Sequence, residues 1–445
     1  MQGAGLFEPG PLGLVGRPDD LLGHHRSGHG APSFRRSDSQ RALRHARGEV
    51  PDRSYAPCVR GGPDLTASLG TLTGMTELTP FTVDVPEADL DDLRRRLAAT
   101  RLPDAPRGID WSSGVERGYL AELLRVWRDE FDWRAVEKRL NAWPQVTTTI
   151  DGQPVHAVHA RSDHADAVPL LLLHGWPSTP ADFLLVLPAL VERFHVVAPS
   201  LPGSGLSGPT LEVGWDLDRY ARTLLELMSR AGHERFVVQG GDWGALIGPH
   251  LARLAPERVA LVHVNALATP ADWRSGDPTT GLSEEDAAQV FALGALWEVR
   301  SGYATIMGTR PQTLAYALAD SPVGLLAWHL EWFVDYDPGT TAQTPVDPVA
   351  ILTDVTTTWL TGTAASSGRI YRECHDAFVP HEPSGVPTAV ACFTGDHTVR
   401  GLAERSHRIV RWRRYDTGGH FASLQAPELL VADLVEACEE HVSAR

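Results

Sequence analysis

The chain has few cysteines and few basic residues, and both shortages limit what it can be. Four cysteines in 445 residues, with no CxxC spacing among them, are too few for a disulfide framework and are interpreted as ordinary buried thiols. The 40 lysines and arginines are outnumbered by 56 aspartates and glutamates, so the net charge is −16. This deficit argues against nucleic acid and anionic membranes as partners.

Long apolar runs are also missing. No segment approaches the length needed to span a bilayer, and the N-terminus lacks the basic-then-apolar order of a signal peptide. We therefore expect a cytoplasmic protein without a membrane anchor. A hydrophobic content of 42% is typical of a globular protein, and 445 residues are enough for two or three domains.

Residues 1–74 differ from the rest of the chain. They contain 13 glycines and 7 prolines without a sustained helix or strand period, which is the composition of a disordered tail. The cluster of His24, His25 and His29 could chelate a metal, but no second ligand group stands at a recognisable spacing. Met75 then opens densely patterned sequence, which suggests that an upstream start was assigned in error.

Hydrophobic periodicity predicts helices and then alternating strands after Met75. Residues 87–101 and 115–131 carry apolar side chains at helical spacing, within a predicted N-terminal meander region over 75–145. Eight apolar runs are predicted as strands: 146–150, 155–159, 170–173, 194–198, 236–239, 259–264, 388–393 and 408–415. Because helical segments alternate with them, we expect an α/β fold with a mostly parallel sheet covered on both faces.

A long insertion separates the sixth and seventh predicted strands. Residues 266–386 contain no convincing strand and are predicted to form a helical cap. The insertion is rich in tryptophan, with Trp297, Trp328, Trp332 and Trp359. The α/β core is then split into a first part over 146–265 and a second part over 387–445.

One glycine-rich segment matches a nucleotide-binding pattern, and we reject it. Residues 203–208 read GSGLSG, which fits GxGxxG and follows a predicted strand. Prolines surround the segment, no helix opens at its end, and Glu226 lies on a helical face instead of ending a second strand. We interpret it as a Gly/Pro loop and expect no cofactor.

The segment FVVQGGDWGALIG, residues 236–248, places a carboxylate where a strand turns into a helix. Gly240-x-Asp242-x-Gly244 has the spacing of the nucleophile elbow G-x-S-x-G, with aspartate in place of serine. The glycines let strand and helix pack closely around a strained residue, and the following helix favours the anionic form of Asp242. The alternative is that Asp242 only caps the helix.

Three further segments follow predicted strands. HGWP should aim backbone N–H groups at the reaction centre, so the N–H groups of Trp176 and Trp243 are the predicted oxyanion-hole donors and His174 braces the loop. ACFTGD places Asp396 immediately after a strand, and in DTGGHF the loop after a strand delivers His420 just before a helix. Nucleophile, acid and then histidine is the chain order of α/β-hydrolases.

An aspartate nucleophile limits the chemistry. It attacks carbon to form an ester, which His420 can resolve by activating water while Asp396 steadies the imidazole. The electrophile should therefore be an epoxide or a carbon–halogen bond. Opening an epoxide needs a proton donor, and Tyr303 and Tyr371 in the insertion are candidates because phenols stay protonated at neutral pH. For each tyrosine alone, an ordinary core role is the alternative.

These motifs together resemble the microsomal-type epoxide hydrolase family. The resemblance covers about residues 79–440 and includes HGWP, PSLPGSGLSG, GGDWG, GYATIMGTRPQTLAYALADSPVGL, TWLTGT, RIYRE and GGHFASLQAPELL. It implies Asp242 as nucleophile, His420 as base, Tyr303 and Tyr371 as ring-opening acids, and Asp396 as the acid of a loop that varies between aspartate and glutamate. A hydrophobic epoxide and water would give a vicinal diol without cofactor or metal.

Two departures and two alternatives stay open. Ser178-Thr179 follow HGWP where the family usually has glycine, and Ser204 takes a place that is more often aromatic, so substrate size is in question. The main alternative function is dehalogenation by the same aspartate; the HGWP motif and the paired tyrosines argue against it. The second alternative is a binding protein without catalytic activity. The sequence leaves the natural epoxide and the oligomeric state open, a homodimer included.

Overall fold

The computed structural model describes residues 77–274 and 276–442, which belong to one compact unit. The predicted disordered tail over 1–74, its histidine cluster, Met75 and Cys58 lie outside the described residues. The other three cysteines, Cys374, Cys392 and Cys438, are buried and free, as predicted.

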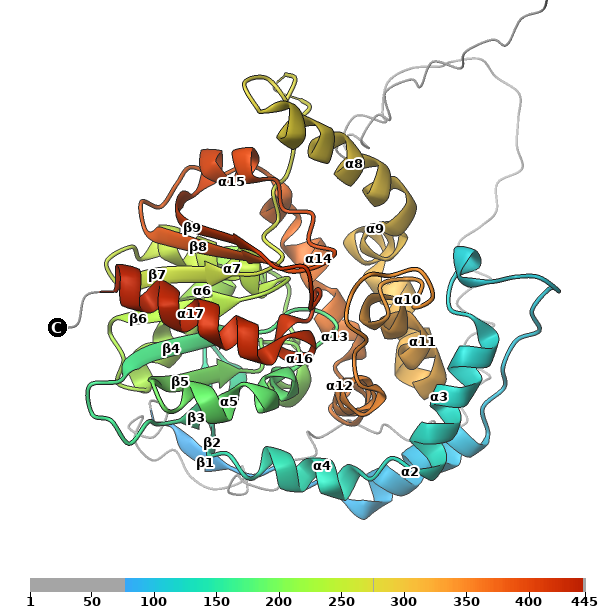
Figure 1. The fold of residues 1–445 in the computed structure, drawn as a ribbon. Coiled ribbons are helices and arrows are strands. Elements are labelled where there is room, and N and C mark those ends of the chain that lie inside the picture. Colours follow the sequence, from blue (N-terminus) through green and yellow to red (C-terminus); the bar gives the residue numbers. More distant parts are fainter. Residues whose placement is uncertain (1–76, 275, 443–445) are drawn as a thin grey trace, which may run out of the picture. The chain divides into compact units, whose positions relative to one another are not determined.

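A nine-stranded sheet forms the centre of the described residues, in the order β1-β2-β3-β5-β4-β6-β7-β8-β9 (Figure 1). The strands are β1 (Thr79–Phe81), β2 (Gln145–Ile150), β3 (Gln153–Ala160), β4 (Val168–Leu173), β5 (Phe194–Pro199), β6 (Phe236–Gly240), β7 (Val259–Val264), β8 (Pro387–Cys392) and β9 (Arg408–Arg414). Pairing is antiparallel from β1 to β5 and parallel from β5 to β9. The predicted α/β fold with a mostly parallel sheet is confirmed.

The predicted strands agree with the structure, apart from one omission. All eight are present, with each end within two residues of its predicted position. The prediction missed β1, a three-residue strand that contains Pro80 and pairs only with β2. The helical insertion therefore follows the seventh strand, β7, and not the sixth.

Helices cover both faces of the sheet, because its inner strands are apolar on both sides. Leu170 and Leu172 of β4 pack with α5 (Leu187–Leu190) and α17 (Pro427–His441). Leu171 and Leu173 face the opposite layer, where α6 (Leu217–Arg230) and α7 (Gly244–Leu254) pack. Two shorter helices, α15 (Arg400–Ser406) and α16 (Ala422–Gln425), flank β9 in the chain.

Between residue 77 and β2 the structure has three α-helices, where the sequence predicted two. The predicted ones are α2 (Glu87–Ala98) and α3 (Arg117–Asp129). The missed helix, α4 (Trp133–Leu140), has eight residues and begins after Asp132, whose side chain caps it. It was missed because two turns of helix give too short a period to recognise.

Seven α-helices lie between β7 and β8 in the described part of the insertion: α8 (Glu284–Arg300), α9 (Gly302–Thr309), α10 (Pro311–Asp320), α11 (Pro322–Phe333), α12 (Pro348–Leu360), α13 (Ala364–Gly368) and α14 (Ile370–Glu373). Helices α2 and α3 share one apolar cluster with α11 and α12, and Figure 1 shows them beside each other. Within the described ranges, no helix is both long enough and apolar enough to cross a membrane.

Candidate active site

Asp242 lies in the turn between β6 and α7. It has a φ of 53°, a left-handed conformation that is strained for aspartate. A side chain at Gly244 would overlap the backbone of Leu173 on β4, so the turn requires glycine there. The residue before α7 is Trp243, and no side chain caps the helix. The alternative that Asp242 is a helix cap is therefore wrong, and its carboxylate is free to face the site.

The HGWP loop reaches Asp242 from the neighbouring strand. Leu173 of β4 pairs with Gly240 of β6, so both loops leave the same edge of the sheet. The Trp176 N–H donates to Oδ1 of Asp242 at 2.8 Å. Gly175 has no room for a side chain because the Asp242 carboxylate lies against it. The Trp176 amide, one of the two predicted oxyanion-hole donors, thus already holds the predicted nucleophile.

His174 braces the same loop, as predicted. Its Nδ1 donates to the Gly175 carbonyl at 2.8 Å, and its Nε2 accepts from the Leu201 N–H at 3.0 Å. Burial lowers the pKa of His174 to about 4, so the imidazole is neutral and keeps this tautomer. Because both ring nitrogens are hydrogen-bonded, His174 is not available as a general base.

His420 lies on the other side of Asp242. Its Nε2 is 3.4 Å from Oδ2 of Asp242, an ion pair when the imidazole is protonated. Two side chains hold its backbone: its N–H donates to Oε1 of Gln343 at 2.9 Å, and its carbonyl accepts from Nδ2 of Asn265 at 3.2 Å. Gln343 and Asn265 were missed, because they are distant in sequence and only their positions in the fold reveal the contact.

Asp396 follows β8, but its carboxylate is engaged elsewhere. Oδ2 accepts from the Ala266 N–H at 3.0 Å, and Oδ1 accepts from the N–H and Oγ1 of Thr398 at 2.8 and 2.6 Å. Within the described part of the chain, no hydrogen bond or ion pair joins it to His420. The structure thus brings Asp242 and His420 together, and the role of Asp396 as the acid that supports His420 stays a prediction.

The two predicted acids come from α9 and α14. Tyr303 and Tyr371 are 8% and 6% exposed, and their ring centroids are 5.4 Å apart. Trp176 stacks on Tyr303 at 5.5 Å, and the Trp243 ring meets Tyr371 edge to face at 4.9 Å. Both phenols are therefore packed against the residues that flank Asp242 in space.

The environment keeps both phenols protonated. Burial raises the pKa of Tyr303 and of Tyr371 well above the ordinary value, and the negative charge on Asp242 raises it further. A third ring, that of Trp332 on α11, lies 5.1 Å from Tyr303 and 4.8 Å from His420. The site therefore combines charged groups from the sheet with neutral, buried donors from the helical insertion.

A pair of buried carboxyl groups adjoins the site and was missed. Asp182 lies on the 3-10 helix η3 (Pro180–Leu185) and Asp354 on α12; they are 4% and 0% exposed, and each affects the pKa of the other. Asp182 lines a pocket of about 370 Å³ together with Asp242 and His420. The only sequence signal is a single carboxylate within the run ILTDVTTTWL.

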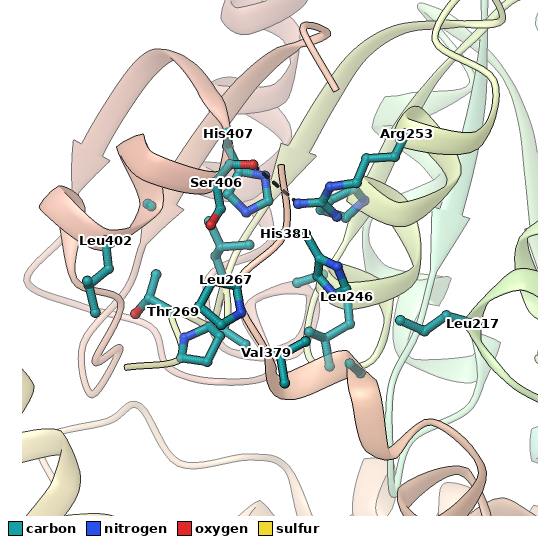
Figure 2. A pocket seen from close by; sticks show the side chains of 17 residues that line it. Leu217, Leu246, Arg253, Leu267, Thr269, Val379, His381, Leu402, Ser406 and His407 are labelled. Carbon is teal, nitrogen blue, oxygen red and sulfur yellow. Dashed lines mark hydrogen bonds between the residues drawn. The ribbon is translucent and has the colours of Figure 1, made fainter. Parts of the chain in front are cut away.

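A second pocket, of about 460 Å³, lies apart from these residues (Figure 2). Its walls are mostly apolar and include Arg253, His381 and His407; Nη2 of Arg253 donates to the Ser406 carbonyl at 3.2 Å. None of the five predicted catalytic side chains lines it. Across the described residues, no cluster of three or more His, Cys, Asp or Glu side chains could hold a metal ion.

Comparisons with known proteins show the family and the fold of the chain. A family model described as the epoxide hydrolase N terminus matches residues 78–183, and one described as the α/β-hydrolase fold matches residues 168–427. Epoxide hydrolase 1 of Sus scrofa is 30% identical over 403 residues, which cover 80% of this chain and 87% of that protein. The chain belongs to the epoxide hydrolase family of α/β-hydrolases.

Other members of the epoxide hydrolase family extend the agreement. A protein of Stigmatella aurantiaca is 39% identical over 373 residues, or 81% of this chain and 84% of that protein. The solved structure of Aspergillus niger epoxide hydrolase has a TM-score of 0.73 at 30% identity, over 82% of this chain and 97% of that one. Juvenile hormone epoxide hydrolase from Bombyx mori has a TM-score of 0.72 at 26% identity, over 82% and 95%. The predicted resemblance and fold are confirmed.

Proposed function

We propose that this protein hydrolyses a hydrophobic epoxide to a vicinal diol through an ester on Asp242. The observation that carries the proposal is the placement of the Asp242 carboxylate, with one oxygen 2.8 Å from the Trp176 amide nitrogen and the other 3.4 Å from the His420 imidazole. A carboxylate fixed in this way can attack carbon, and the adjacent histidine can act on the ester that results. Membership of the epoxide hydrolase family supports the same reaction.

Ring opening is the first step. An oxygen of Asp242 attacks a ring carbon and breaks the carbon–oxygen bond, while Tyr303 or Tyr371 donates its proton to the departing oxygen. Burial keeps both phenols protonated until then, as the direction of their pKa shifts requires. Their packing against Trp176 and Trp243 supports this assignment, since those residues also flank Asp242.

Hydrolysis of the ester is the second step. His420 takes a proton from water, whose oxygen attacks the carboxyl carbon of Asp242, and the N–H groups of Trp176 and Trp243 stabilise the oxyanion. The intermediate collapses and releases the diol, whose new hydroxyl keeps the other proton of the water. The proton on His420 returns to the tyrosine that gave up its own. Asp396 is the proposed acid that supports the imidazolium.

The helical insertion supplies the environment of the substrate in this proposal. We assign residues 266–386 as a cap, with 146–265 and 387–445 as the two parts of the core and 75–145 as the N-terminal meander. Aromatic rings from the cap, among them Trp332, face the site and favour an apolar substrate. The cytoplasmic location and a homodimer stay predictions.

A substrate panel tests the proposal. Styrene-type, aliphatic and juvenoid epoxides, and haloalkanes, are incubated with the protein, and diol, alcohol and halide are measured. We expect diol from at least one class of epoxide, and none from Asp242→Ala. Halide release without diol formation would favour dehalogenation by the same aspartate, and no product from either class would favour a silent binding protein.

A further inference from the structure

Asp182 and Asp354 are buried carboxyl groups that lie close enough for each to affect the pKa of the other. Both side chains are buried, and a hydrogen bond between two carboxyl groups needs a proton on one of them. Oδ1 of Asp354 is already occupied, because it accepts from Oγ1 of Thr179 at 2.6 Å. Oδ1 of Asp182 and Oδ2 of Asp354 are buried and have no hydrogen-bond partner among the described residues. One proton shared between the two carboxyl groups would satisfy both oxygens.

The proton belongs on Asp354, so the charge belongs on Asp182. Asp354 is fully buried, and its neighbour Asp182 is negative, and both effects disfavour its ionised form. Asp182 has the better surroundings for a charge, because the Asp354 and Ser178 side chains and the charge of His420 each lower its pKa against the rise that burial causes. No lysine or arginine of the described chain forms an ion pair with either residue. The pair therefore carries a single negative charge that no cation neutralises.

This charge lies beside His420. Asp182 lines the same pocket as Asp242 and His420, and η3 packs against α16, which begins at Ala422, two residues after His420. A negative charge that lines the same pocket favours a positive imidazole. Asp396, by contrast, uses its carboxylate oxygens on Ala266 and Thr398.

We propose that Asp182 is a positioning residue for ester hydrolysis: the charge that Asp354 confines to it stabilises the protonated His420 that forms when water attacks the Asp242 ester. This inference rests on the proposed function. No bond to Asp182 forms or breaks; His420 takes the proton from water as before. Ring opening, which does not protonate His420, should not need Asp182.

Two isosteric variants separate charge from packing. Asp182→Asn removes the charge but keeps a side chain of the same shape. Asp354→Asn keeps the charge, because its amide can donate to Asp182 in place of the carboxyl proton and its oxygen can still accept from Thr179. Asp216→Asn, at the start of α6, is the matched control, since asparagine caps a helix as well as aspartate does.

Single-turnover kinetics with an epoxide substrate measure ring opening and ester hydrolysis separately. We expect Asp182→Asn to slow hydrolysis by about 10- to 100-fold, so that the ester accumulates, while ring opening stays within about 2-fold of the wild-type rate. Asp354→Asn should slow hydrolysis at most a few-fold. Melting temperatures of the two variants are measured alongside, and we expect both proteins to be folded.

Three results would overturn the inference. The first is ester hydrolysis at the wild-type rate in Asp182→Asn. This result counts if His420→Gln accumulates the ester, because that accumulation shows that the proposed pathway operates. The second is an equal loss of both steps, which a purely structural role predicts. The third is the absence of ester in every variant, His420→Gln included, which would remove the proposed function together with this inference.

Discussion

The sheet edge and the helical insertion hold their functional groups in different ways. At the sheet edge, backbone N–H groups fix the carboxylates: Trp176 donates to Asp242, and Ala266 donates to Asp396. In the insertion, Tyr303 and Tyr371 are held by aromatic packing and burial. The difference shows that hydrogen bonds from the backbone position the carboxylates, whereas aromatic packing and burial position the neutral phenols. Substitutions of Asp242 and of the two tyrosines should impair ring opening, whereas those of His420 and Asp396 should impair ester hydrolysis.

The largest effect is expected at the sheet edge. Asp242→Ala should abolish turnover, because it removes the carboxylate that attacks the epoxide in the proposed mechanism. His420→Gln should also lose turnover but still form the ester, since the imidazole acts only in the second step. Mass spectrometry of intact protein after mixing with epoxide distinguishes the two: an adduct with His420→Gln and none with Asp242→Ala. Turnover by Asp242→Ala would contradict the ester mechanism.

The next largest effect is expected in the insertion. Tyr303→Phe and Tyr371→Phe should each slow ring opening by roughly 10²- to 10⁴-fold, or less where the other phenol compensates. The double variant should be almost inactive and still folded, because phenylalanine preserves the packing. Rapid-mixing measurements of ester formation check this. Normal ring opening in the double variant would show that both tyrosines are ordinary core residues.

A smaller effect is expected at Asp396. Asp396→Asn should slow ester hydrolysis by about 10- to 100-fold and ring opening much less, because the lost charge supports only the imidazolium. Stopped-flow traces should show the ester accumulating. If both steps slow equally, Asp396 is not the acid that supports the imidazolium. Glu404 on α15, the alternative along the chain, is exposed and pairs with Arg400.

The smallest effect is expected in the pH dependence of stability. It should distinguish the buried Asp182–Asp354 pair from exposed carboxylates. Burial raises the pKa of Asp182 to about 6, from an ordinary value of 3.8. A raised folded-state pKa means that the native state binds the proton more tightly than the unfolded state. The stabilisation that protonated Asp182 contributes is fully present below its pKa in the unfolded state. It is lost as pH rises through the folded-state pKa of about 6. We expect the loss to be on the order of 2 kcal/mol between pH 4 and 8.

Urea unfolding at both pH values measures that contribution. Asp182→Asn has no carboxyl proton to lose there, so its free energy of unfolding should fall less between pH 4 and 8 than that of the wild type. An exposed control, Asp132→Asn, should keep the wild-type slope. Parallel curves for the wild type and Asp182→Asn would contradict the pKa assignment.

The sequence predicts the site residues at the sheet edge more completely than the contacts made by the insertion. Asp242, His174 and His420 directly follow apolar strands or their loops, and the carboxyl ends of parallel strands meet at one edge, so order along the chain predicts proximity. The short strand β1 and helix α4 were missed because three residues with a proline, and two turns of helix, carry too little periodicity.

The contacts between distant segments could not be predicted in this way. Gln343 contacts the backbone of His420 from 77 residues away, and Thr179 reaches Asp354 across 175 residues. No spacing rule links such positions; the second contact arises where α12 packs against η3. The same limit applies to Asp396, which follows its strand as expected but directs its oxygens to Ala266 and Thr398.

The most direct test of the account is a single turnover in ¹⁸O-labelled water with enzyme in excess over epoxide. If water attacks the ester carbon, the heavy oxygen enters the Asp242 carboxylate and the diol carries an oxygen that came from the enzyme. Mass spectrometry of the peptide that contains GGDWG, and of the diol, reads both positions. We predict labelled Asp242 and unlabelled diol; labelled diol beside unlabelled Asp242 would mean direct hydration and would contradict the covalent mechanism.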